Sequence, residues 1–126
     1  MTSRAAFGAL ALAFAAGPAL AQQATPLLCL LRPVCTQTDC DPASFTVEIA
    51  PIDHEPGLWL VLDGVQAPLR DVTPLAAPMQ SFVTLDLAER RIISVFASGA
   101  AIYSRHFEAP GRGPEVETAI GQCEVL

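Results

Sequence analysis

Hydrophobic and polar residues alternate along short stretches of the chain, and turn-forming residues separate these stretches. In residues 44–50, Phe45, Val47 and Ile49 fall on one side of an extended chain and the polar residues on the other. This period of two predicts a half-buried β-strand. Length, alternation and flanking turn residues predict further strands at 58–62, 67–73, 81–85, 90–96, 100–107 and 115–120.

These short strands predict an all-β fold. The sequence has 11 Pro and 8 Gly, which interrupt it too often for long helices. The connections are too short for parallel crossovers, so neighbouring strands should be antiparallel. We expect a sandwich or small barrel of about six or seven strands. Residues 22–43 are expected to form a disulfide-braced loop at the start of this single domain, 22–126.

The first 21 residues have the pattern of a cleavable export signal. Arg4 lies in a short charged start, an uncharged apolar run follows, and Ala19-Leu20-Ala21 fits a small-x-small cleavage site. The apolar run is shorter than the roughly 20 residues that a membrane-spanning helix needs. We therefore expect a mature chain that begins at Gln22 and lies in the periplasm or outside the cell, without a membrane anchor.

The sequence contains 4 cysteines, an even number that predicts two disulfides in an exported domain. The short spacing between Cys35 and Cys40 favours a local bridge. Cys29 would then pair with Cys123 and tie the two ends of the fold together, although spacing alone does not fix this connectivity.

Composition narrows the range of partners. Without Arg4, six Arg and no Lys stand against 13 Asp plus Glu, which gives the mature chain a formal charge of -7. An acidic surface repels nucleic acid and anionic lipid, so we expect neither as a partner. The missing Lys also excludes Schiff-base and Ser-Lys catalysis. No catalytic set or cofactor motif is recognisable, and we expect no cofactor.

One polar cluster is a weak candidate for a metal site. Asp53, His54 and Glu55 lie together between two prolines, and one His with two carboxylates is half of a typical ligand set. The alternative is a solvated turn, which is where such residues usually occur.

The segment 90–107 reads as a hairpin around Ser98-Gly99, and its register has two solutions. A two-residue turn would place Tyr103 and Phe107 on the face opposite Ile93 and Val95. A three-residue loop with a bulge would bring both aromatics into the core with Ile93 and Val95. Aromatic residues mixed with Arg are enriched in binding surfaces. The candidate binding residues are Arg90, Phe96, Ser98, Tyr103, Arg105 and Phe107.

Two resemblances to known proteins add to this interpretation. The layout resembles small exported all-β proteins of unknown function, through Cys29, Cys35, Cys40, Phe45-Thr46-Val47-Glu48-Ile49, Gly99 to His106 and Gly121-Gln122-Cys123. Locally, Phe96-Ala97-Ser98-Gly99-Ala100 is similar to the Ser-Gly-Ala hairpin loop of periplasmic C-type lysozyme inhibitors, which are small disulfide-bonded antiparallel barrels. That resemblance implies Ser98 as a residue inserted into the lysozyme cleft, but the Trp-x-Lys-Gly strand of those inhibitors is missing.

The sequence therefore predicts a soluble exported protein that acts by binding and not by catalysis. The leading hypothesis is an interaction module, inhibitors included, for an envelope or extracellular protein. The alternative is a small-ligand or metal-binding protein, or a weak enzyme that uses His54 and its neighbouring carboxylates.

Overall fold

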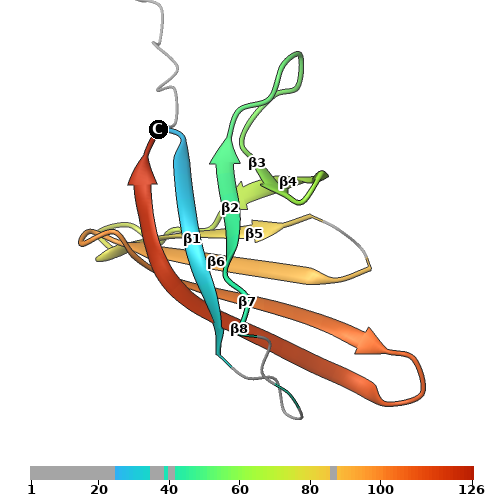
Figure 1. Ribbon diagram of the computed structural model, residues 1–126. Helices are drawn as coiled ribbons and strands as arrows, with labels where there is room; N and C mark the ends of the chain where they lie inside the picture. Colours follow the sequence, from blue (N-terminus) through green and yellow to red (C-terminus); the bar gives the residue numbers. More distant parts are fainter. Residues whose placement is uncertain (1–24, 35–38, 40–41, 86–87) are drawn as a thin grey trace, which may run out of the picture.

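The computed structural model describes residues 25–34, 39, 42–85 and 88–126. These residues form strands and turns without a helix (Figure 1). The strands are β1 (Leu27–Val34), β2 (Phe45–Ala50), β3 (Trp59–Leu62), β4 (Val65–Asp71), β5 (Met79–Thr84), β6 (Arg90–Phe96), β7 (Ala100–Ala109) and β8 (Gly113–Val125). Among the described residues, no helix is long and apolar enough to cross a membrane. The predicted export signal 1–21, Cys35 and Cys40 lie outside the described residues.

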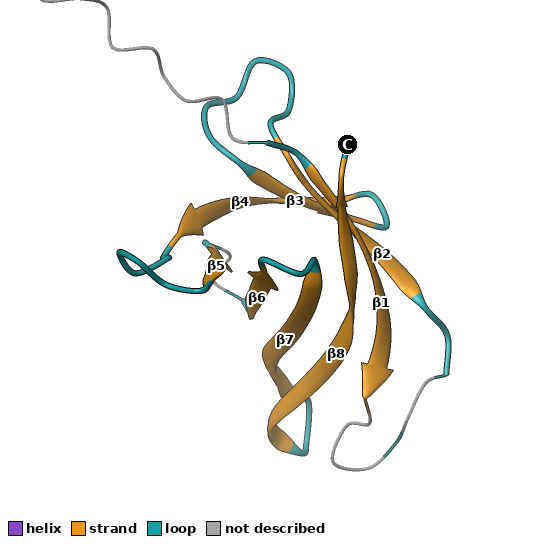
Figure 2. Cartoon of the chain, turned by 90° about the vertical axis from the view of Figure 1, so that its left-hand side faces the viewer, coloured by secondary structure: helices purple, strands orange, loops and turns teal. Residues whose placement is uncertain are grey.

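The strands form a closed antiparallel barrel in simple chain order. Each strand pairs with the next, and β8 returns to pair with β1. Figures 1 and 2 both show β1 and β8 side by side at this closure. The prediction of an all-β fold is confirmed. Of the two predicted architectures, the structure is the barrel and not the sandwich. The number of strands is slightly higher than predicted. Closure leaves no free sheet edge, so all eight strands are paired on both sides.

The prediction of a loop over residues 22–43 is wrong for its central part, which is β1. Cys29 and Leu31 of this strand are fully buried inside the barrel, whereas Leu28 and Leu30 point outward. Leu30 is 52% exposed. Leucines on both faces hide the alternation that marks a strand in the sequence. The 13 residues of β8 likewise exceed the predicted 115–120, because β8 pairs with both β7 and β1.

The interior is packed by apolar side chains from all eight strands; β4 contributes the buried Ala67, and its Leu69 packs against the main cluster from the border. Burial of each large aliphatic or aromatic side chain contributes about 1.5–3 kcal/mol. The buried cluster consists of Cys29, Leu31, Val47, Ile49, Leu60, Phe82, Ile93, Val95, Ala101, Tyr103 and Ala119.

Two turns set the register of the hairpins. Asp63 and Gly64 both have positive φ, 47° and 77°, as a two-residue type I′ turn requires. The β6–β7 connection is the three-residue loop Ala97–Gly99, in which Gly99 has a φ of 85° and donates its N–H to the Phe96 carbonyl. Ile93 therefore lies opposite Tyr103, and Tyr103 is buried in the core. The second of the two predicted registers is the one observed, but Phe107, which it also placed in the core, is only partly buried and lies outside the core cluster.

The contact between β1 and β8 closes the barrel, and a disulfide crosses it. Cys29 and Cys123 are directly opposite in the register, with Cα atoms 3.9 Å apart, and are bonded to each other. This confirms the predicted pairing of these two cysteines. Two residues away, Gly121 lies opposite Leu31, where its lack of a side chain lets the two backbones approach closely.

Candidate functional site

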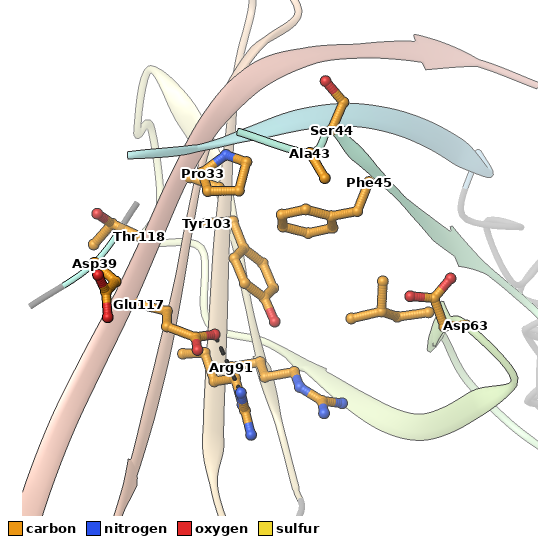
Figure 3. A pocket seen from close by; sticks show the side chains of 13 residues that line it. Pro33, Asp39, Ala43, Ser44, Phe45, Asp63, Arg91, Tyr103, Glu117 and Thr118 are labelled. Carbon is orange, nitrogen blue, oxygen red and sulfur yellow. Dashed lines mark hydrogen bonds and ion pairs between the residues drawn. The ribbon is translucent and has the colours of Figure 1, made fainter. Parts of the chain in front are cut away.

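A cavity of about 410 Å³ opens at one end of the barrel. This end is formed by the C-terminal part of β1, the start of β2, the β3–β4 turn and the adjoining parts of β6, β7 and β8. An eight-stranded barrel has room for packed side chains or for one small ligand. Its lining, drawn in Figure 3, consists of Pro33, Asp39, Ala43, Ser44, Phe45, Leu62, Asp63, Arg91, Tyr103, Arg105, Glu117, Thr118 and Ala119.

The upper wall of the cavity in Figure 3 is aromatic and apolar. The rings of Phe45 and Tyr103 meet edge to face, with centroids 5.5 Å apart. Elsewhere in the lining, Leu62, half-buried at the end of β3, adds an aliphatic surface. The Tyr103 hydroxyl points toward the side of the cavity where Arg91 lies. A ligand in this cavity would therefore meet apolar surface on one side and polar groups on the other.

The opposite side of the cavity carries a network of four charged side chains. Arg91 and Arg105 are direct cross-strand partners on β6 and β7, and both line the cavity. Glu89 accepts hydrogen bonds from both guanidinium groups, and Glu117 accepts one from Arg105 at 3.1 Å. Two like charges directly opposite each other destabilise a sheet, so the carboxylates offset a repulsion that the fold builds in.

Arg91 is the most deeply placed charge of this network. Its side chain is only 8% exposed, and its backbone N–H donates to the hydroxyl of the fully buried Thr84. Nη2 donates to Glu89 at 2.8 Å, but Nε and Nη1 have no acceptor among the residues that the structure describes. A buried donor without a partner costs about 1–3 kcal/mol, and more on a charged group. Because Arg91 also lines the cavity, its guanidinium is a candidate for ligand contact.

Arg105 differs from Arg91 because its Nε and Nη1 both donate to carboxylates within the protein. Desolvation lowers the pKa of Arg105, but the hydrogen bonds that it donates to Glu89 and Glu117 raise this pKa by more, so the guanidinium stays charged. Its guanidinium carbon also lies 4.3 Å from the centre of the Phe107 ring, in cation–π geometry. Arg105 is therefore held in place on three sides.

Burial raises the pKa of the Tyr103 hydroxyl, although the nearby Arg91 and Arg105 oppose this. The folded chain then holds the phenolic proton more tightly than the unfolded chain, whose tyrosine pKa is about 10. We predict that the free energy of unfolding is unaffected below pH 10 and falls above it, until the folded tyrosine also ionises. Because Tyr103 is the single tyrosine of the chain, ultraviolet absorbance measures its ionisation directly.

The matched control is Tyr103→Phe, which removes the titrating group and keeps the ring. Its free energy of unfolding should lack the step that wild type shows above pH 10. A tyrosine titration midpoint at or below 10 in the folded protein would contradict this prediction.

The structure separates the candidate binding residues into three places. Tyr103, Arg105 and Phe107 lie on the inward face of β7, and the first two line the cavity. Arg90 and Phe96 occupy the outward register of β6. Ser98 is exposed in the β6–β7 loop, at the other end of β6 from Arg91, roughly 16 Å along the strand. These residues do not form one cluster.

The weak metal candidates lie in an exposed turn between β2 and β3. Asp53, His54 and Glu55 are all exposed, and His54 has a positive φ of 66°. Within the described ranges, no three His, Cys, Asp or Glu side chains come together as a possible metal site. This turn is also at the end of the barrel opposite the cavity.

Sequence reasoning missed Arg91, Glu89 and Glu117 as site residues. For Arg91 the signal was present, because Arg91 shares the odd-numbered face of β6 with the buried Ile93 and Val95. For Glu89 and Glu117 no local signal exists, since their contact with Arg105 depends on how β6, β7 and β8 meet.

Comparison of the chain with protein-family models, with curated proteins and with solved structures found no match.

Proposed function

We propose that this chain is an exported binding protein that holds its ligand in the cavity at the Arg91 end of the barrel. The observation that carries the proposal is the cavity itself, which combines an aromatic wall at Phe45 and Tyr103 with buried polar donors. Ligand sites typically have this composition, with an apolar lining and a few convergent polar groups. The signal pattern of residues 1–21 and the Cys29–Cys123 disulfide support an oxidising compartment, the periplasm or the cell exterior.

A protein partner is a second candidate, supported by an apolar outer face. We call the exposed side chains of Leu30, Ile102 and Ile120 the outer patch. Ile102 and Ile120 are direct cross-strand partners on β7 and β8 and are 48% and 54% exposed. Leu30 lies on the neighbouring β1. Contiguous exposed apolar side chains mark interaction surfaces.

One titration with a neutral fluorescent probe distinguishes the cavity from the outer patch. The probe is N-phenyl-1-naphthylamine, whose emission rises in apolar surroundings. We predict saturable binding of one probe per chain. Leu62→Trp, which places a larger side chain at the cavity wall, should weaken it at least about tenfold, equivalent to roughly 1.4 kcal/mol.

The matched control carries Ile102→Thr and Ile120→Thr, which remove apolar surface from the outer patch and keep β-branched residues in the strands. Probe binding should be unchanged in this double variant. Loss of binding only in the double variant, with Leu62→Trp unaffected, would overturn the cavity and favour a surface for a protein partner. Circular dichroism verifies that both variants are folded.

A further inference from the structure

We propose that the cavity selects small carboxylic acids with an apolar or aromatic body, and that Arg91 binds the carboxylate. This inference rests on the proposed function, because it names the ligand class for the same cavity. It depends on the hydrogen-bond donors of the Arg91 guanidinium that are left without a partner among the described residues.

Hydrogen-bond acceptors are unevenly divided between the two arginines at the charged side of the cavity. Glu89 is shared by two guanidinium groups, and Glu117 accepts a hydrogen bond from Arg105. Arg105 therefore bonds to two carboxylates, whereas Arg91 bonds to the shared Glu89 alone among the described residues. Within the described residues, the nitrogen atoms of this network that are buried without an acceptor are Nε and Nη1 of Arg91.

The ligand group that complements the Arg91 guanidinium follows from the chemistry of its donors. A guanidinium has only hydrogen-bond donors, so the ligand group bound at Arg91 must be an acceptor. A carboxylate fits best, because its two oxygens match the planar fork of the guanidinium. The side chain is 8% exposed, and a charge–charge contact there is screened less by water than one at the surface. The Tyr103 hydroxyl points to the same side and is protonated at neutral pH, as an ordinary tyrosine is; burial raises its pKa further. It is therefore available as a further donor.

The rest of the ligand must match the apolar part of the cavity. A group bound at Arg91 extends into a space bordered by Phe45, Tyr103 and Leu62. These side chains provide apolar contact and no charge. Asp39 and Asp63, which also line the cavity, are exposed, so solvent and salt screen their repulsion of an anion. A small organic acid with an apolar body meets all of these conditions, whereas inorganic anions leave the apolar wall unused.

The test compares 1-naphthaleneacetate with its neutral amide, 1-naphthaleneacetamide, as competitors of the bound neutral probe. The two compounds have nearly the same shape and differ in charge. We predict that wild type binds the acid at least about tenfold more tightly than the amide. In Arg91→Met this preference should disappear, so that acid and amide compete with the neutral probe equally well.

Arg90→Met is the matched control, because Arg90 is the adjacent residue of β6 on the outward face. It should retain the wild-type preference for the acid. If Arg91→Met does not fold, Arg91→Lys provides the second variant: it keeps the charge, loses the planar fork, and should reduce the preference several-fold.

Equal affinity for acid and amide in wild type would overturn the carboxylate inference and leave the cavity proposal intact, provided that the neutral probe still binds. Absence of saturable probe binding would overturn the proposed function itself. A preference for the acid that persists in Arg91→Met would assign the anion to another group and would also contradict the inference.

Discussion

Gly121→Ala should destabilise the barrel by about 3 kcal/mol or more, the largest effect we expect from any single methyl group in this chain. A Cβ at this position would lie 1.9 Å from the Leu30 carbonyl oxygen and 3.0 Å from the Leu31 Cα. These are backbone atoms of β1, so no side-chain rotation can relieve the overlap. The pairing of β1 with β8 must open instead, and that pairing is what closes the barrel.

Chemical denaturation measures this effect, with Gly57→Ala as the matched control. Gly57 has a positive φ of 83° but no atom within 4 Å of an added Cβ. Its substitution therefore measures the strain of a left-handed conformation alone, about 1–2 kcal/mol. If Gly121→Ala were no more destabilising than Gly57→Ala, the close approach of β1 and β8 would be contradicted.

Removal of the Cys29–Cys123 disulfide should lower the free energy of unfolding by about 4 kcal/mol. The bond joins residues 94 positions apart, and closure of a loop of this length restricts the unfolded chain strongly in the chain-entropy model. The double substitution Cys29→Ala and Cys123→Ala removes the bond without a buried hydroxyl. Denaturation of the oxidised wild type and the double variant gives the difference.

A reducing agent provides the control for this prediction. Reduction of wild type should produce a loss close to that of the double variant. Reduction of the double variant measures the contribution of the remaining cysteines separately. A double variant as stable as oxidised wild type would show that this bond does not hold the ends of the barrel together.

The alternating strands and the short apolar run of β3, which a turn closes, could be predicted from the sequence, whereas β1 could not. β2 has Phe45, Val47 and Ile49 directed inward, as its pattern predicts. β1 was missed because Leu28 and Leu30 are apolar yet point outward, away from the core. The strand is held by its pairing with β2 and β8, which its own sequence pattern does not show. Closure of the barrel likewise depends on pairing between strands at opposite ends of the chain, which local patterns do not encode.

The candidate site was predicted in part for the same reason. Tyr103 and Arg105 were named, but the register of the β6–β7 hairpin was open between two solutions. The three-residue loop that ends at Gly99 selects the solution in which Tyr103 and Arg91 face inward. Ser98, which local sequence resemblance favoured, lies at the opposite end of the barrel from the cavity.

The central claim is that the Arg91 end of the barrel is where this protein binds its ligand. Backbone amide chemical shifts of isotope-labelled protein, recorded while 1-naphthaleneacetate is added, test it most directly. We predict saturable shifts that concentrate at Phe45, Leu62, Arg91 and Tyr103, and none at His54 or Ser98 at the other end. Shifts confined to His54 and Ser98, or no shifts at any concentration, would contradict the claim.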